Sequence, residues 1–198
     1  MKPKGLYGLV LSGGKSTRMG EDKGLISYYG LPQREYLYQL LDKVCERTFI
    51  SLRSDQTEGL PSAYGVILDQ DVYRGPFNGI LSAHMRYPEV AWLVLACDLP
   101  LIHEAALQEL IAHRNKEAVG TTLALKNDNP LPEPVCAIWE PHGLDTAMEY
   151  LANDANGTCA RKFLIRNHAH LVFPEDESVL VNANSKEDYD TIVSKIKG

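Results

Sequence analysis

Short apolar runs recur along the chain, and most of them end at glycine, proline or a polar residue. Runs of about four to eight apolar residues are typical of strands that are buried on both faces of a sheet. This pattern predicts strands at 6–11, 48–53, 64–68, 91–97, 119–125 and 135–139. A further short strand is expected at 171–173, after a polar turn that contains His168 and His170.

Apolar residues with helical spacing separate these runs. They recur on one helix face within 36–44 and 106–111, and residues 80–84 suggest another helix. Ser185 and Asp188 are expected to be a capping pair that opens the last helix. Strands that alternate with helices favour a mainly parallel sheet covered on both faces. The sequence therefore predicts an α/β fold, a Rossmann-like three-layer sandwich around a mainly parallel mixed sheet.

Length and composition are consistent with one folded unit. The chain has 198 residues, of which 44% are hydrophobic, and no linker rich in proline, glycine and serine divides it. A chain of this size can build one substantial core. We therefore expect a single domain over residues 1–198.

The charge pattern bears on the partners of the protein. The formal net charge is −6 at pH 7, and the cations are scattered among acids. Proteins that bind nucleic acid or anionic membranes usually carry a basic stripe instead. No stretch approaches the roughly 18 apolar residues of a membrane-spanning helix. We expect neither nucleic acid nor a membrane as a partner.

The cysteines bear on the cellular compartment. Cys45, Cys97, Cys136 and Cys159 are far apart in the sequence and form no CxxC pair. Such spacing favours buried, reduced thiols over disulfides or a zinc site. The sequence therefore predicts a cytoplasmic protein.

The most informative segment, LSGGKSTRMGEDKG, directly follows the first predicted strand. Gly13 and Gly14 remove two side chains in succession, so a phosphate can approach main-chain N–H groups there. Lys15, Arg18 and Lys23 add positive charge, and a guanidinium can bind two phosphate oxygens while an ammonium acts as a point charge. The segment predicts a site for a nucleoside triphosphate. A glycine turn with solvated surface cations is the structural alternative.

A P-loop kinase is a second interpretation of this segment. Gly14, Lys15 and Ser16 spell the end of a P-loop, and Asp98 after the run WLVLAC resembles its metal-binding partner. The P-loop pattern needs a glycine five positions before its Gly-Lys pair. Leu9 stands there, which disfavours this interpretation.

Asp98 is a second candidate functional residue, because it follows a buried strand and lies close to Pro100 in the sequence. Ligands of parallel α/β sheets bind beyond the carboxyl ends of the strands, where the glycine turn and Asp98 would both emerge. A carboxylate at that edge can bind Mg²⁺ that enters with a triphosphate. The alternative is that Asp98 caps a helix beginning near His103.

With these residues in view, the chain resembles the MobA-like nucleotidyltransferases of molybdenum cofactor biosynthesis. The glycine segment is similar to the family signature LAGGxSxRMGxDK, most closely that of the guanylyltransferase branch, and only Ser12 departs from it, where alanine is usual. Three later segments match in the same order: GPFNG at 75–79 (GPLAG in the family), LACDLP at 95–100 and VNANS at 181–185 (VNVNT in the family).

The resemblance implies a fold like that of nucleotide-diphospho-sugar transferases and a defined reaction. A phosphate oxygen of molybdopterin would attack the α-phosphorus of GTP, pyrophosphate would leave, and Mg²⁺ would be the cofactor. A phosphate monoester is largely ionised at neutral pH, so no general base is required. The implied partners are GTP and molybdopterin or the molybdenum cofactor, with transient contact to cofactor-delivery or molybdoenzyme-maturation proteins.

The resemblance also implies roles by position. The residues matching catalytic positions are Arg18, Lys23 and Asp98, and Asp98 is the implied magnesium ligand. The implied nucleotide-binding residues are Leu11, Ser12, Gly13, Gly14, Lys23, Asp69, Gly79 and Asp98. Asp69 is placed on the base, because a carboxylate can accept from the N1–H and the amino group of guanine. The implied acceptor-binding residues are Arg161, Lys162, Asn182 and Asn184.

Other interpretations stay open beside guanylyl transfer. Asp69 could be an acid in a solvated turn, and the Arg161–Lys162 pair could be exposed helix cations. Cytidylyl transfer is the competitor within the family, although that branch typically shows AAG where Ser12 to Gly14 stand. A nucleotide-binding regulator without turnover is the alternative of another class, which the presence of Arg18, Lys23 and Asp98 disfavours.

Overall fold

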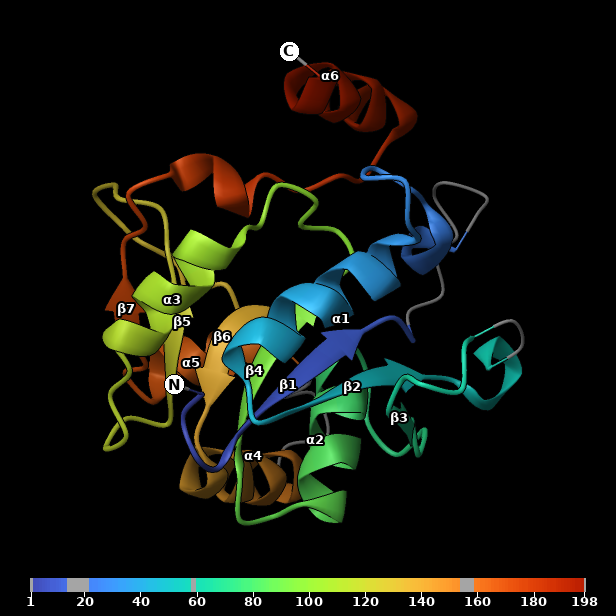
Figure 1. Cartoon of the computed structure of the whole chain (residues 1–198). Helices are drawn as coiled ribbons and strands as arrows, with labels where there is room; N and C mark the ends of the chain where they lie inside the picture. Colours follow the sequence, from blue (N-terminus) through green and yellow to red (C-terminus); the bar gives the residue numbers. More distant parts are fainter. Residues whose placement is uncertain (1, 14–21, 58–59, 154–158, 198) are drawn as a thin grey trace.

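The computed structural model describes residues 2–13, 22–57, 60–153 and 159–197. Within these ranges, one sheet contains seven strands (Figure 1). The strands are β1 (Leu6–Leu11), β2 (Arg47–Leu52), β3 (Val66–Leu68), β4 (Ala91–Ala96), β5 (Gly120–Leu123), β6 (Cys136–Trp139) and β7 (His170–Val172). Their order across the sheet is β3-β2-β1-β4-β6-β5-β7.

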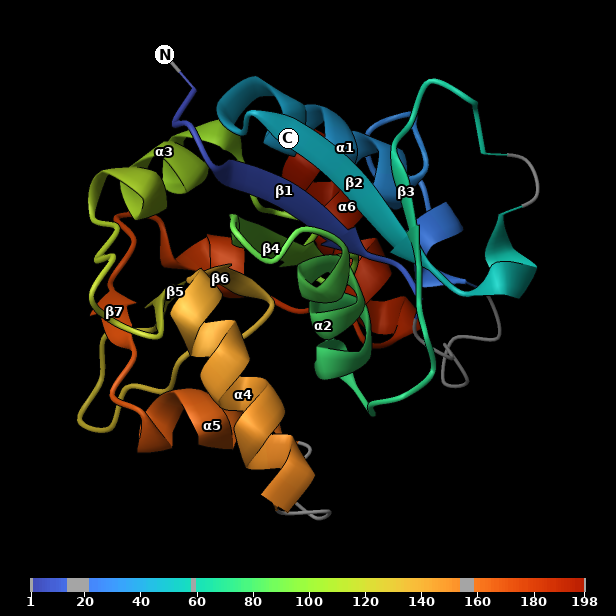
Figure 2. The same cartoon turned by 90° about the horizontal axis from the view of Figure 1, so that it is seen from below.

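Helices cover both faces of this sheet. The helices are α1 (Gln33–Val44), α2 (Pro76–Arg86), α3 (Glu104–Ala112), α4 (Pro141–Asn153), α5 (Ala160–Arg166) and α6 (Lys186–Lys197). Three short 3₁₀ turns are η1 (Lys23–Leu25), η2 (Ser54–Gln56) and η3 (Glu177–Leu180). Figure 2 shows α1 and α3 on one side of the sheet and α2, α4 and α5 on the other. The predicted three-layer α/β sandwich is confirmed.

The sheet is mixed, and its one reversal matters for the site. β3, β2, β1 and β4 run parallel, so their carboxyl ends lie at one edge. β6 pairs antiparallel with both β4 and β5, while β7 is parallel to β5. Leu95 near the end of β4 pairs with Cys136 at the start of β6. Residues that precede β6 therefore meet residues that follow β4.

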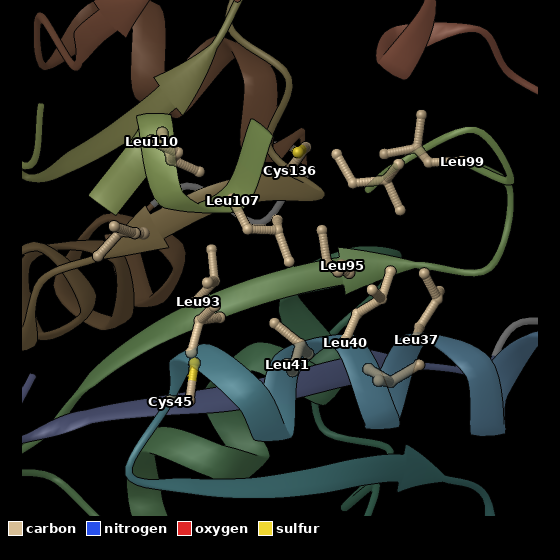
Figure 3. Packing of buried hydrophobic residues seen from close by; sticks show 14 of the residues in the cluster. Leu37, Leu40, Leu41, Cys45, Leu93, Leu95, Leu99, Leu107, Leu110 and Cys136 are labelled. Atoms are coloured by element: carbon tan, nitrogen blue, oxygen red, sulfur yellow. The ribbon is translucent and has the colours of Figure 1, made fainter. Parts of the chain in front are cut away.

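The alternation of side chains along the strands builds two apolar layers. In β4, Leu93 and Leu95 belong to the layer under α1 and α3, whereas Trp92 and Val94 belong to the layer under α2, α4 and α5. Figure 3 shows leucines of α1 and α3 packed against β4. Each fully buried leucine contributes roughly 1.5–3 kcal/mol, so both layers hold the strand ends rigidly.

Helix α6 lies apart from the two main layers (Figure 1). Its Ile192 packs with Tyr28 and Ala183 in a small third cluster. At its start, the Ser185 N–H donates to Asp188 Oδ2 at 2.8 Å, and the Asp188 N–H donates to the Ser185 hydroxyl at 3.1 Å. The predicted capping pair is therefore confirmed.

Several sequence-based expectations need correction. Helix α4 was not predicted, although Leu144, Ala147, Met148 and Leu151 recur at helical spacing and pack in or against the apolar layer on that side of the sheet. The structural alternative for Asp98, that it caps a helix beginning near His103, is wrong, since the ring nitrogen of His103 accepts from the Ala106 N–H at the start of α3.

The cysteines follow the expectation with one exception. All four are free thiols; Cys45, Cys97 and Cys136 are buried, but Cys159 is exposed because it lies just before α5, at the surface. In the described ranges, no helix has the length and apolar content needed to cross a lipid bilayer.

Candidate active site

A cavity of about 440 Å³ lies at the carboxyl ends of β1, β2, β3 and β4. Its walls come from four turns that follow these strands, from the start of α2, and from one residue ahead of β6. The lining residues are Leu11, Ser12, Gly13, Asp22, Lys23, Gly24, Ser51, Arg53, Asp69, Asp71, Tyr73, Gly75, Pro76, Asn78, Gly79, Ala96, Cys97, Asp98 and Val135. The fold therefore brings together sequence segments that are up to about 120 positions apart.

Most residues that the resemblance marked for nucleotide binding line this one cavity. These residues are Leu11, Ser12, Gly13, Lys23, Asp69, Gly79 and Asp98. Gly14, Lys15 and Arg18 lie outside the described residues. The structure therefore gives the described residues of this set a common location.

The glycines of the cavity allow close packing of polar side chains. A Cβ atom on Gly13 would collide with the Asp69 carboxylate, and one on Gly24 would collide with the Ser12 hydroxyl. A Cβ on Gly79 would meet the Ser51 hydroxyl and lie 2.7 Å from Leu11 Cδ2. Gly13 was expected to admit a phosphate, and here it also admits the carboxylate of Asp69.

Asp98 follows β4 and presents a carboxylate with one unsatisfied oxygen. Its Oδ1 atom is buried and has no hydrogen-bond partner among the residues that the structure describes. Burial raises the pKa of Asp98 above its usual value, while the Lys23 ammonium acts in the opposite direction. A buried oxygen without a partner is unfavourable unless a ligand or cation completes its environment.

Lys23 connects the glycine segment to the C-terminal part of the chain. Its ammonium donates to the Ala183 carbonyl at 3.0 Å and to Asn184 Oδ1 at 2.8 Å. The Ala183 N–H in turn donates to the Asp98 carbonyl at 2.9 Å. The structure therefore gathers Lys23, Asp98 and Asn184, which are distant in the sequence. Asn182 is exposed, and its amide donates to the Leu180 carbonyl instead.

Asp69 and its neighbours form another part of the cavity wall. The Ser51 hydroxyl donates a short hydrogen bond to Asp69 Oδ1. Burial raises the pKa of Asp69, and the Ser51 bond counteracts that shift. Asn78 lines the cavity, accepts from the Tyr73 N–H at 3.3 Å and donates to Asp71 at 3.5 Å.

Of the two departures from the family segment GPLAG, only one faces the cavity. Asn78 lines it, whereas Phe77 is fully buried against the rings of Trp139 and Phe163. The phenylalanine is therefore a core substitution, and the asparagine alone alters the wall of the site.

Arg161 of α5 lies beside the loop that precedes β6. Its Nε donates to the Pro132 carbonyl at 3.0 Å, and its Nη2 donates to Glu133 Oε2 at 2.8 Å. Burial raises the pKa of Glu133; Arg161 acts against this shift, and the Asp98 charge adds to it. Glu133 is thus within electrostatic reach of both Arg161 and Asp98. Lys162 is exposed on the same helix.

Sequence reasoning missed several residues of this region. It assigned no role to Arg53, Asp71 or Tyr73, which line the cavity, or to Glu133. A usable signal for Glu133 was an acid between two prolines directly ahead of a buried strand.

A divalent cation fits one part of the site. In the parts of the chain that the structure describes, no three His, Cys, Asp or Glu side chains are grouped closely enough to hold a metal. Asp98 Oδ1 is nevertheless buried, acidic and without a hydrogen-bond partner. Mg²⁺ is commonly held by one or two carboxylates together with substrate phosphates and water. Asp98 could supply the protein ligand of such an ion.

Comparison with known proteins places this geometry in context. Residues 8–171 match the MobA-like NTP transferase domain. A "Molybdenum cofactor biosynthesis bifunctional protein" of Synechocystis sp. is 39% identical over 188 residues, which cover 94% of this chain but 53% of that protein. The chain thus spans about half the length of this relative.

Two further proteins cover nearly the full chain. A "Molybdenum cofactor guanylyltransferase" of Pseudomonas fluorescens is 29% identical over 185 residues, covering 90% of this chain and 89% of that protein. The crystal structure of "Molybdopterin-guanine dinucleotide biosynthesis protein A" from Archaeoglobus fulgidus superposes with a TM-score of 0.75 at 21% identity, covering 96% of this chain and 98% of that one. At this identity the structural likeness supports the fold alone.

Proposed function

The chain belongs to the MobA-like NTP transferase family, and from this premise we propose that residues 1–198 form one domain that transfers GMP from GTP to the phosphate of molybdopterin. The bond between the α- and β-phosphates of GTP breaks, a new bond forms between the α-phosphorus and the acceptor oxygen, and pyrophosphate leaves. The guanylyltransferase name of the Pseudomonas fluorescens relative supports this choice of substrate.

In this proposal the nucleotide occupies the cavity between β1, β3 and β4. Main-chain N–H groups beside Gly13 and Gly14 hold the phosphates, and Lys23 and Arg18 balance their negative charge. Lys23 is well suited to this role because its ammonium lies at the cavity wall and is already oriented by Ala183 and Asn184.

Asp98 is proposed as the ligand of Mg²⁺. When bound, the ion supplies positive charge that orients and screens the triphosphate. The buried, unpartnered Oδ1 of Asp98 supports this assignment, since a cation would complete its environment. No other residue is assigned to the metal, and its remaining ligands are proposed to be phosphate oxygens and water.

Asp69 is proposed to select guanine. A carboxylate accepts hydrogen bonds, and guanine presents the N1–H and the amino group as adjacent donors. The Ser51 hydroxyl fixes one carboxylate oxygen, and Gly13 leaves room for the other. Cytosine does not offer that pair of donors in the same arrangement, so a preference for GTP over CTP follows.

The acceptor is proposed to enter from the side of Asp98 that faces β6 and α5. Arg161, Lys162, Asn182 and Asn184 are the candidate contacts of its phosphate and pterin. Arg161 has the strongest support, because its guanidinium is held by Glu133 and the Pro132 carbonyl near Asp98. A guanidinium fixed in this way is suited to bind phosphate oxygens. An acceptor of this kind also implies transient contact with proteins that deliver it or use the product.

The observation that carries the proposal is the meeting of Lys23, Asp69 and Asp98 around one cavity at the ends of β1, β3 and β4. In the proposal, Lys23 and Asp98 act on the phosphates, and Asp69 recognises the base. Because the acceptor phosphate is already largely ionised near neutral pH, positioning and charge balance suffice, and a general base is unnecessary.

A pyrophosphate-release assay tests this function. The protein is incubated with Mg²⁺, molybdopterin and GTP, CTP or ATP in separate reactions. Release with GTP alone supports the proposal, whereas preferential release with CTP identifies a cytidylyltransferase. Nucleotide binding without release in any reaction identifies a regulator. Lys23→Ala should reduce release strongly, while the matched control Lys43→Ala, on an exposed pair with Glu104, should not.

A further inference from the structure

One side chain outside the cavity links both flanks of the glycine-rich segment. Gln56 ends η2, is half-buried and does not line the cavity. Its Nε2 donates to the Ser12 carbonyl at 3.2 Å and to Asp22 Oδ2 at 2.6 Å. Ser12 precedes residues 14–21 in the sequence, and Asp22 follows them. A single amide group thus connects the two ends of this segment.

The Gln56 amide is itself held in one orientation. Its Oε1 accepts from the Arg53 N–H at 3.1 Å, and the Gln56 N–H donates to the Arg53 carbonyl at 3.0 Å. Arg53 Nη1 donates to the Gly13 carbonyl at 2.9 Å, while Asp55 holds the same guanidinium at 3.0 Å and 3.1 Å. The turn after β2 therefore contacts the main chain of Ser12 and of Gly13 at once.

The Asp22 carboxylate connects Gln56 to the turn that begins at Lys23. Its Oδ2 accepts from Gln56, and its Oδ1 accepts from the Gly24 N–H at 2.9 Å, which caps η1. The turn η1 begins at Lys23. Gly24 packs so closely on the Ser12 hydroxyl that a Cβ there would collide with it. A shift of Gln56 would therefore move Ser12 and Lys23 relative to each other.

We propose that Gln56 is a positioning residue for nucleotide binding. It fixes the distance between the main chain of Ser12 and Gly13 on one side and Lys23 on the other, so that both can contact one polyphosphate. This inference rests on the proposed function, since it assigns the phosphates of GTP to these groups. Gln56 does not touch the nucleotide itself, and its effect passes through Ser12 and Asp22.

The first test replaces Gln56 by leucine, which keeps a similar volume and removes all hydrogen bonds of the side chain. Mg²⁺–GTP binding is measured by titration calorimetry without acceptor, and KM is then measured for GTP and for molybdopterin. We expect Kd and KM for GTP to rise about tenfold, the loss typical of a hydrogen bond to a charged group. KM for molybdopterin should stay unchanged. Gln108→Leu, which removes an exposed glutamine bonded to Glu104, is the matched control.

The second test reverses the polarity of the contact. Gln56→Glu places a carboxylate against Asp22 and should weaken GTP binding more than tenfold. Adding Asp22→Asn restores a hydrogen bond between positions 22 and 56 and keeps an oxygen to cap the Gly24 N–H. The double variant should therefore recover part of the lost GTP affinity, which a nonspecific loss of folding would not do.

The results separate this inference from the proposed function. If the natural protein transfers GMP and Gln56→Leu matches Gln108→Leu, the positioning role is wrong and the proposed function stands. A parallel loss of affinity for GTP and molybdopterin, with a lowered thermal midpoint and no recovery in the double variant, would show a purely structural residue and also overturn the inference. If the natural protein neither binds nor uses any nucleoside triphosphate, both proposals fall.

Discussion

Replacing Asp98 by asparagine should make the protein more stable and nearly inactive. The substitution keeps the shape of the side chain and removes its charge. In the fold, Asp98 Oδ1 is buried without a partner, and burial raises the pKa of the carboxyl group. The charged form is therefore less favourable in the folded than in the unfolded chain.

The magnitude follows from two opposing contributions. A buried polar group without a hydrogen-bond partner costs about 1–3 kcal/mol, and more when it is charged, so the neutral amide at this position is penalised less than the carboxylate. The partly exposed Lys23 ammonium returns at most about 1 kcal/mol through its attraction to the carboxylate. The net gain from Asp98→Asn is thus roughly 1–2 kcal/mol near neutral pH. For a chain of this length, each kcal/mol shifts the thermal midpoint by about 2–4 °C. Pyrophosphate release should fall by about 10²–10³-fold, because a fixed charge at the reacting phosphates is lost.

The assay is thermal unfolding followed by circular dichroism at several pH values, with the natural protein and the variant side by side. The penalty from Asp98 is complete above its raised folded pKa and disappears below its ordinary pKa, where the group is protonated in both states. The stability advantage of the variant should therefore shrink as the pH falls through this window. A variant less stable than the natural protein at neutral pH, or an advantage independent of pH, would refute the reasoning.

Three other substitutions test separate parts of the structure. Asp69→Asn should reduce the preference for GTP over CTP by at least about tenfold in pyrophosphate release, since an amide presents a donor where guanine also donates. Glu140→Ala should lower the free energy of unfolding in urea by about 3–5 kcal/mol, because it leaves the largely buried Arg114 guanidinium without the two bonds it makes at 2.6 Å and 2.7 Å. The exposed pair of Lys43 should contribute less than about 1 kcal/mol by the same measurement. Arg161→Gln should raise KM for molybdopterin while leaving KM for GTP unchanged, and an equal rise in both would contradict its assignment to the acceptor.

The fold was largely predictable because most of its strands are continuous apolar runs. The run at 91–97 matches β4, and that at 6–11 matches β1. The run at 64–68 forms a strand only from Val66, although the Gly65 carbonyl still accepts from the Ile50 N–H of β2 at 2.9 Å. The prediction missed helix α4, although Leu144, Ala147, Met148 and Leu151 carry the same kind of periodic signal as the helices that were predicted.

The parts of the candidate site that lie in contiguous sequence motifs were predictable. The parts that depend on tertiary contacts were less predictable. The glycine segment indicated Lys23 directly, and the LACDLP segment indicated Asp98. The bonds of Gln56 to Ser12 and Asp22, and that of Glu133 to Arg161, join residues 28 or more positions apart. Spacing along the chain does not indicate which residues pair over such separations, so these contacts are known only from the fold.

The antiparallel strand β6 brings a second part of the chain to the edge of the sheet where the cavity lies. Turns after the parallel strands β1, β2 and β3 build one part of the cavity wall, whereas the approach to β6 brings Val135 to the cavity and Glu133 within electrostatic reach of Asp98. Asp69, the proposed contact of the base, and Arg161, the proposed contact of the acceptor, are encoded by separate stretches of chain that follow β3 and precede β7. A substitution at one of them can therefore be made without altering the segment that carries the other.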